Sequence, residues 1–126
     1  MPVNALQHIN IRSADVERSR AFYRLLGLTD GPRPPFASMG YWMYAGEDPV
    51  VHLVQKKPDE PVLGPGTGDL DHIALGAVGL AAMREELNRQ GIAYREAVVP
   101  RDGSIQLFVP DPDGVTLELN FSGPDS

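Results

Sequence analysis

The chain has 126 residues and no cysteine, so disulfides, thiolate metal ligands and cysteine nucleophiles are excluded. Eleven Lys and Arg residues against seventeen Asp and Glu residues give a formal net charge of −6, and the basic residues are scattered along the chain. Nucleic acids, which need a clustered positive face, are therefore not expected as partners. The sequence shows no apolar run of membrane-helix length and no leader pattern at residues 1–4, so we expect a cytoplasmic protein that does not bind membranes.

The beginning of the chain predicts a strand followed by a helix. Apolar and polar residues alternate over residues 5–11, as in a half-buried strand. Ser13 or Asp15 can cap a helix over about 15–26, and Gly27 supplies the left-handed residue that ends it. The apolar face of this helix is expected to hold Val16, Phe22, Leu25 and Leu26.

Two further strands are predicted before the middle of the chain. A turn-rich stretch over 29–35 leads to strands at about 38–45 and 49–55, and the turn Gly46–Pro49 separates these two strands. The Pro- and Gly-rich residues 58–68 that follow are interpreted as a linker.

The second half of the chain repeats this order of elements. In chain order we expect a strand at 70–76, a helix at about 79–90 closed by Gly91, strands near 92–98 and at 104–109, the turn Asp111–Gly114 and a strand at 115–121. Leu6–Ile11 also matches Leu70–Leu75, which lies 64 residues later. We therefore predict a single α+β domain over residues 1–126, built from two copies of one module at about 4–57 and 69–122.

The four clearest strands each divide into an apolar face and a face with polar residues, because alternate side chains of a strand share a face. The apolar face fits the side of a sheet beneath a helix and holds Ile9, Ile11, Val51, Leu53, Ile73, Leu75, Leu117, Leu119 and Phe121. The other face holds every histidine of the chain, His8, His52 and His72, together with Glu118. This second face is the one expected to receive a ligand.

Three imidazoles and one carboxylate on equivalent faces predict a metal site. Taken singly, His52 can be a buried strand residue bonded to a neighbour, and Glu118 can be a charge that protects an edge strand. The joint pattern favours the metal site, because His8 and His72 occupy one repeat position and His52 and Glu118 occupy another. A divalent cation offsets the cost of burying a carboxylate, and without a thiolate its identity stays open among Fe, Mn, Co, Ni and Zn.

These residues stand within motifs that resemble those of a known superfamily. Ser19–Tyr23 leads to a Leu-Gly-Leu turn, Asp71–Ala74 stands at mid-chain, and Phe108–Leu119 contains Asp-Pro-Asp-Gly followed by Glu-Leu. With His8 on the first strand, residues 5–121 resemble the vicinal oxygen chelate superfamily, which includes glyoxalase I, bleomycin-resistance proteins and extradiol dioxygenases.

The resemblance implies two tandem βαβββ modules whose mixed β-sheets curve into a cleft, the glyoxalase-like fold. For single-chain members of this size it also implies a homodimer whose metal sites take ligands from both subunits. The superfamily's ligand positions fall on His8, His72 and Glu118, with a fourth at His52, where glyoxalase I carries a glutamate that also moves the substrate proton. With histidine in that place, Glu118 must move a proton alone or with His52, so these two are the candidate catalytic residues.

Members of the superfamily share the capture of two adjacent substrate oxygens by one divalent cation acting as a Lewis acid. The resemblance thus implies a metal-dependent enzyme of the lyase, isomerase or dioxygenase type that acts on a small metabolite or xenobiotic. A lactoylglutathione lyase is not favoured, because the second glutamate is replaced. Catechol dioxygenase chemistry lacks further histidines, and fosfomycin resistance lacks a cationic pocket, since lysine occurs only at 56 and 57.

The alternative function is a metal-free protein of the bleomycin-resistance type, which sequesters a cationic ligand in an acidic, aromatic-lined cleft. It shares the fold and the dimer with the enzyme. The retention of four ligand-type side chains argues against it, because a sequestering cleft gains nothing from buried imidazoles.

The candidate substrate-binding residues come from both halves of the chain. Phe36, Trp42 and Tyr44 gather on one strand and its approach, where such side chains line either a pocket or a dimer interface. Arg33 can bind a substrate carboxylate, although a loop arginine is more often solvated. The last two candidates, which share a face of the strand before the final one, are Gln106 and Phe108.

Overall fold

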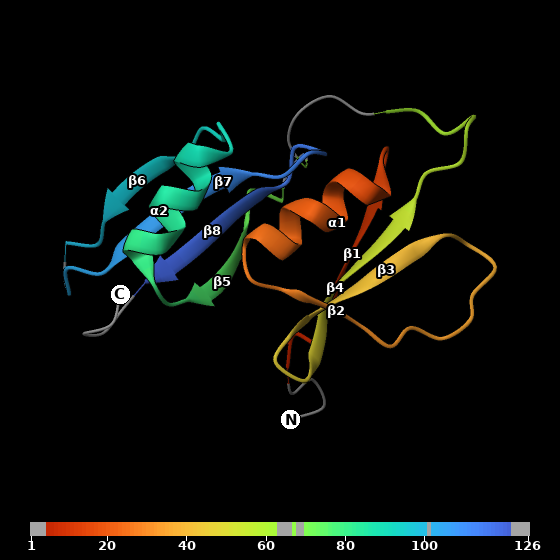
Figure 1. Ribbon diagram of the computed structural model, residues 1–126, viewed down its shortest axis with the longest axis horizontal. Helices are drawn as coiled ribbons and strands as arrows, with labels where there is room; N and C mark the ends of the chain where they lie inside the picture. The colour runs from red at the N-terminus through yellow and green to blue at the C-terminus, as the bar shows by residue number, and fades with distance from the viewer. Residues whose placement is uncertain (1–4, 63–66, 68–69, 101, 122–126) are drawn as a thin grey trace. The chain divides into compact units, whose positions relative to one another are not determined.

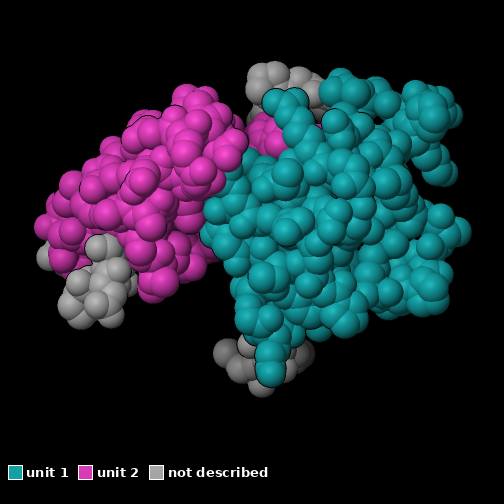
Figure 2. All heavy atoms as spheres, viewed as in Figure 1, with its two compact units in different colours: residues 1–62 teal, residues 63–126 magenta. Residues whose placement is uncertain are grey.

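The computed structural model describes residues 5–62, 67, 70–100 and 102–121. The chain divides into two compact units, unit 1 over Met1–Val62 and unit 2 over Leu63–Ser126, each of which is described by itself (Figure 2). Residues 63–66 and 68–69 of the expected linker lie outside the described residues.

Unit 1 is a four-stranded mixed sheet with one helix (Figure 1). Its elements are β1 (Ile9–Ser13), α1 (Val16–Leu25), β2 (Thr29–Gly31), β3 (Gly40–Ala45) and β4 (Asp48–Gln55). The strands lie in the order β1-β4-β3-β2. The β1–β4 pair is parallel and the other two pairs are antiparallel, and α1 connects β1 at one edge of the sheet to β2 at the other.

Unit 2 repeats the same topology. Its elements are β5 (Ile73–Ala77), α2 (Leu80–Arg89), β6 (Arg95–Val98), β7 (Ile105–Pro110) and β8 (Thr116–Phe121). The strand order is β5-β8-β7-β6, with β5 and β8 parallel. The predicted α+β class and the two βαβββ modules are therefore confirmed, and neither sheet closes on itself.

In both units the apolar face of the sheet is buried and the opposite face is not. In unit 1, α1 packs on β3 and β4, where Met43, Val51 and Leu53 are fully buried (Figure 1). In unit 2, the fully buried Leu87 of α2 and the buried face of β7 and β8 form the core. The alternation predicted from the sequence is confirmed for most positions, but Ile9, Ile73 and Leu75 of the apolar face are only partly buried, and His52 on the other face is only 7% exposed.

Local signals place the helix ends where the sequence predicts them. Asp15 caps α1 by accepting a hydrogen bond from the Arg18 backbone N–H at 3.2 Å. Gly27 follows the helix with φ of 107°, a conformation that a side chain would strain. The helix also buries Tyr23 completely, a core position that the predicted apolar face omits.

Several sequence-based boundaries are wrong, among them the strand expected near 92–98, which begins only at Arg95. Thr29–Gly31, expected as part of a turn-rich stretch, forms β2 as an edge strand paired with β3. The strands expected from residues 5 and 70 begin only at Ile9 and Ile73, so His8 and His72 each stand one residue before a strand. Alternation within one strand does not show how far its pairing extends, and β1 pairs with β4 only from Ile9 and β5 with β8 only from Ile73.

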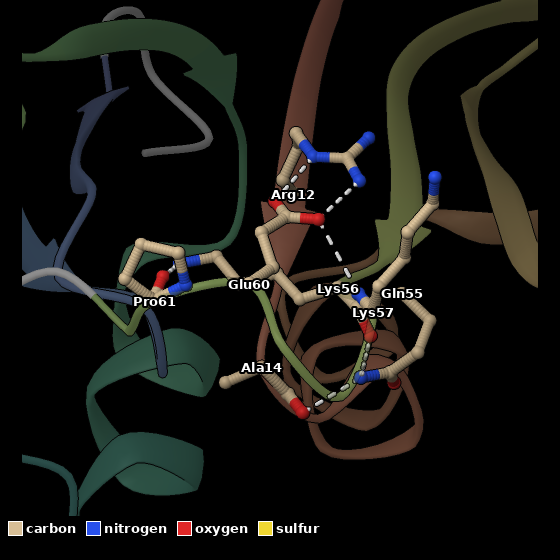
Figure 3. A network of polar contacts seen from close by, with 7 residues as sticks. All are labelled: Arg12, Ala14, Gln55, Lys56, Lys57, Glu60 and Pro61. Carbon is tan, nitrogen blue, oxygen red and sulfur yellow. Dashed lines mark hydrogen bonds and ion pairs between the residues drawn. The ribbon is translucent and has the colours of Figure 1, made fainter.

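The start of the expected linker is bound to unit 1 rather than free of it (Figure 3). Arg12 of β1 donates from Nε and Nη2 to the two carboxylate oxygens of Glu60, each at 2.6 Å. The Lys56 ammonium also donates to the Pro61 carbonyl oxygen at 2.9 Å. A bidentate pair fixes direction as well as distance, so this segment is held against β1.

We expect the carboxyl pKa of Glu60 to depend on Arg12. The guanidinium lowers this pKa to about 2 by its hydrogen bonds, so the pair stabilises unit 1 above the usual carboxyl pKa of 4.5 and loses its effect as the pH falls toward 2. In a pH titration followed by side-chain NMR, Arg12→Gln should return the pKa of Glu60 close to its usual value. The matched change Arg18→Gln should leave it low. An identical Glu60 midpoint with and without Arg12 would contradict the account.

Candidate functional site

The polar face of unit 1 carries a stack of three rings. His52 of β4 lies between Trp42 of β3 and His8, with ring centroids 4.0 Å and 3.9 Å away and an interplanar angle of 11° in both contacts. Strand register places Trp42 directly beside His52, and His8 lies just before β1, two residues from Asn10, the β1 neighbour of His52. The two predicted histidines of unit 1 are thus brought together.

Hydrogen bonds determine which ring nitrogen of each histidine remains available. His52 Nε2 lies 3.0 Å from the Pro49 carbonyl oxygen, which can only accept, so Nε2 carries the proton and Nδ1 keeps the lone pair. His8 Nδ1 donates to Gln7 Oε1 at 3.0 Å, which leaves Nε2 free. Burial, followed by the charge of His8, lowers the pKa of His52, so its neutral form persists.

The polar face of unit 2 pairs His72 with Glu118. His72 Nε2 lies 3.3 Å from Glu118 Oε1, while His72 Nδ1 lies 2.8 Å from Asp71 Oδ2. The hydrogen bond to Asp71 and then the charge of Glu118 raise the pKa of His72 against the opposing effect of burial. The Glu118 side chain is only 12% exposed, so this carboxylate faces the imidazole with little access to solvent.

A side-chain network orients Glu118 from the adjacent strand positions. Asn120 Nδ2 donates to Glu118 Oε2 at 2.8 Å, and Gln106 Nε2 donates to Asn120 Oδ1 at 3.1 Å. Phe108 is the direct cross-strand neighbour of Glu118, and its ring meets that of His72 edge-on at 6.3 Å. The predicted shared face of Gln106 and Phe108 is therefore confirmed.

A pocket of about 660 Å³ opens on the polar face of unit 1. Its lining includes His8, His52, Trp42, Phe36, Arg33 and Ser38. The Arg33 guanidinium lies 5.1 Å from the centroid of the Phe36 ring. Three of the four predicted substrate-binding residues of unit 1 therefore line one cavity together with its two histidines.

Tyr44 is placed differently from the other aromatic candidates. Its hydroxyl donates to the Pro32 carbonyl oxygen at 2.6 Å, and its ring packs against Gly31. The strand register shifts between Met43 and Tyr44, which turns this side chain toward the preceding loop. In the described part of unit 1, Tyr44 therefore holds the loop that carries Arg33.

The candidate metal ligands form two half-sites. Half-site 1 is His8 with His52, and half-site 2 is His72 with Glu118. Among the described residues of either unit, no three His, Asp or Glu side chains form a group that could hold a metal ion. Within the described residues the four candidate ligands are therefore two separate pairs.

Sequence reasoning missed the residues that orient these donors. Asp71 fixes the His72 ring, and Asn120 fixes the Glu118 carboxylate. Both could have been found, because Asp71 directly precedes a predicted ligand and Asn120 lies two residues along the same strand face from another. Metal-binding histidines and carboxylates are commonly oriented by hydrogen bonds from neighbouring polar side chains of this kind.

A family model for the Glyoxalase/Bleomycin resistance protein/Dioxygenase superfamily matches residues 5–119. The chain belongs to this superfamily. The match confirms the resemblance inferred from the His8, Asp71–Ala74 and Phe108–Leu119 segments. No curated protein matches the sequence.

Solved structures show the same glyoxalase-like fold. A glyoxylase/bleomycin resistance protein/dioxygenase domain from Frankia sp. EAN1pec has a TM-score of 0.76 at 16% identity, covering 96% of this chain and 99% of that one. The fosfomycin resistance protein FosX from Listeria monocytogenes has a TM-score of 0.71 at 15% sequence identity, and the match covers 98% of this chain and 95% of that one. Lactoylglutathione lyase from Agrobacterium tumefaciens has a TM-score of 0.64 at 18% sequence identity, and the match covers 97% of this chain and 96% of that one. At these identities the superfamily fold is shared, and the activities belong to those proteins.

No helix in the described residues is long and apolar enough to cross a membrane.

Proposed function

We propose that this chain is a metal-dependent enzyme of its superfamily, in which His8, His52, His72 and Glu118 hold one divalent cation. The observation that carries the proposal is the 3.3 Å approach of His72 Nε2 to Glu118 Oε1. Because Asp71 accepts the proton of Nδ1, a neutral His72 turns its remaining lone pair toward a carboxylate oxygen. Two such donors stay together only with a proton or a cation between them.

The donor set fits a divalent transition metal. Imidazole nitrogens and a carboxylate oxygen suit Fe, Mn, Co, Ni or Zn, and the Asp71–His72 pair is the arrangement that orients metal-binding imidazoles. When bound, the cation supplies Lewis acidity toward two adjacent oxygens of a small substrate. In half-site 1 the lone pairs lie on His8 Nε2 and His52 Nδ1, and because the two rings are stacked 3.9 Å apart at 11°, one ring has to turn before both lone pairs can meet one ion.

Glu118 and His52 are the proposed proton carriers. Asn120 holds Glu118 Oε2 in place, so Oε1 is the oxygen that can accept a proton from substrate carbon. His52 is buried and neutral, and its Nδ1 lone pair can receive that proton when Nδ1 is not bound to the cation. This chemistry is of the lyase or isomerase type.

The proposal is tested by the metal content of protein purified without added metal. The enzyme should carry close to one divalent cation per site, and His72→Ala should lose it. The matched variant His52→Gln, which keeps a side chain able to bond Pro49, should retain more metal than His72→Ala because three ligands remain oriented. Metal-free protein that also fails to take up added Mn²⁺ or Zn²⁺ would instead favour the sequestering protein of the bleomycin-resistance type.

We also propose that the protein is a homodimer in which half-site 1 of one subunit completes half-site 2 of the other. Mixing His8→Ala protein with His72→Ala protein should then restore about one metal site per mixed dimer, because one of its two sites keeps all four ligands. The measurement is metal content of the re-equilibrated mixture against each variant alone. No recovery in a mixture shown to exchange subunits would contradict a shared site.

A further inference from the structure

We propose that the pocket of unit 1 binds a small, flat carboxylate, with the carboxylate on Arg33 and the flat body against Phe36 and Trp42. The inference rests on the proposed function in one respect: the molecule in this pocket is the substrate of the adjacent metal site. Three features of the pocket indicate this substrate class: the Arg33 guanidinium has unused donors, its position is fixed, and an aromatic wall stands beside it.

Arg33 has donors that the protein leaves unused. Its Nη1 donates to the Ser38 carbonyl oxygen at 3.0 Å and its Nη2 to Ser38 Oγ at 3.2 Å. Its Nε is buried and has no hydrogen-bond partner within the part of the chain that the structure describes. Nor does Arg33 pair with a carboxylate among those residues, in contrast to Arg12, Arg20 and Arg84. Because Nη1 and Nη2 each carry a second N–H beyond the one bonded to Ser38, these two N–H groups are the donors that a ligand carboxylate in the pocket can use.

The position of Arg33 is fixed by its surroundings. Gly40 lies below the guanidinium, where a Cβ atom would come within 3.1 Å of Arg33 Nη2 and would overlap the Leu53 carbonyl oxygen. The Tyr44 hydroxyl holds the adjacent Pro32 carbonyl. A cation positioned in advance binds an anion with little further loss of side-chain freedom. The absent side chain at Gly40 thus makes room for the cation on the sheet face.

The wall beside Arg33 is aromatic and suits a flat molecule. Phe36 and Trp42 have ring centroids 6.4 Å apart at an angle of 47°, and Phe36 is 54% exposed. One face of Trp42 is already covered by His52, which holds the indole in place. Covering this exposed aromatic surface with the flat ring of a ligand removes apolar area from water, which favours binding. The cavity volume of about 660 Å³ is typical of small-molecule sites.

The charges of the pocket favour a carboxylate over other ions. Among the lining residues, Asp48 is the single carboxylate and Arg33 the single guanidinium, so the anionic group of a ligand is expected at Arg33. No lysine lines the described pocket, and two of the guanidinium N–H groups already bond Ser38. One partly engaged guanidinium matches a single negative charge better than the double charge of a phosphonate.

The test uses 2-naphthoate and metal-stripped protein. Trp42 is the sole tryptophan of the chain, so its fluorescence reports binding at this wall, and calorimetry gives the dissociation constant. The parent protein should bind naphthoate and should bind the neutral isostere 2-naphthamide at least about tenfold more weakly. Arg33→Gln should raise the dissociation constant of naphthoate by a similar factor. Arg18→Gln, which removes the same charge from the exposed face of α1, should bind as the parent does. Arg33→Lys keeps the positive charge but loses the planar pair of donors, so its affinity for naphthoate should lie between that of the parent and that of Arg33→Gln.

Equal binding of naphthoate and naphthamide would overturn the inference, as would unchanged affinity in Arg33→Gln. Tighter binding of 2-naphthylphosphonate or of a naphthyl ammonium compound would also overturn it. Because the protein is metal-stripped, these results do not depend on the metal site. A protein that binds naphthoate but takes up no metal would contradict the proposed function alone, and the reverse outcome would contradict only the inference.

Discussion

A Glu118→Gln variant is expected to bind a divalent cation at least about a hundredfold more weakly than the parent protein. The change removes the only carboxylate of the proposed ligand set while keeping an amide oxygen that Asn120 can still bond. Even residues that only orient a ligand alter metal affinity roughly 10- to 100-fold, so loss of a charged ligand should exceed that range. The measurement is competition between the protein and a chelator of known affinity for Zn²⁺.

The matched control for this variant is Glu85→Gln. Glu85 lies on the exposed surface of α2, so the substitution makes the same change in net charge at a distance from the polar face of the sheet. Its Zn²⁺ affinity should equal that of the parent. If Glu118→Gln kept parent affinity, Glu118 would be no ligand and the 3.3 Å contact with His72 would be an ordinary ion pair.

Leu53→Ala is expected to lower the free energy of unfolding of unit 1 by about 2–5 kcal/mol. Leu53 is fully buried at the centre of β4, between Ile11 of β1 and Tyr41 of β3. Alanine there leaves a cavity between the sheet and α1 that a paired central strand cannot close by moving. Urea unfolding followed by Trp42 fluorescence measures unit 1, because the sole tryptophan lies on β3 of that unit.

Val62→Ala controls for loss of apolar side chain without loss of packing. Val62 is 73% exposed, so its replacement should change the free energy of unfolding by no more than about 0.5 kcal/mol. A Leu53→Ala effect as small as that of Val62→Ala would show that the buried face of β4 is not the core of unit 1.

The arrangement of elements could be predicted because local signals agree with one another. Asp15 and Gly27 set the limits of α1, and the repeat relates Leu6–Ile11 to Leu70–Leu75, so one half of the chain supports the assignment of the other. The two-residue period of the strands assigned each side chain to a face. That period separated Val51 and Leu53 from His52 with no knowledge of which strand lay beside which.

What depends on neighbouring strands could not be predicted. The stack of His8, His52 and Trp42 depends on the register between β3 and β4 and on the residues just before β1, which alternation within one strand does not contain. Tyr44 has the same parity as Trp42, yet a register shift turns it toward the loop. The edge strand β2 was missed because its residues, Thr-Asp-Gly, have little strand preference and form a strand only by pairing with β3.

The central claim is that His8, His52, His72 and Glu118 bind a single cation. The most direct measurement is a crystal structure of the Zn²⁺-loaded protein with anomalous scattering recorded at the zinc edge. We predict one peak about 2.0–2.2 Å from nitrogens of His8, His52 and His72 and an oxygen of Glu118. A peak bound elsewhere, or these side chains facing different environments with no shared ion, would contradict the claim.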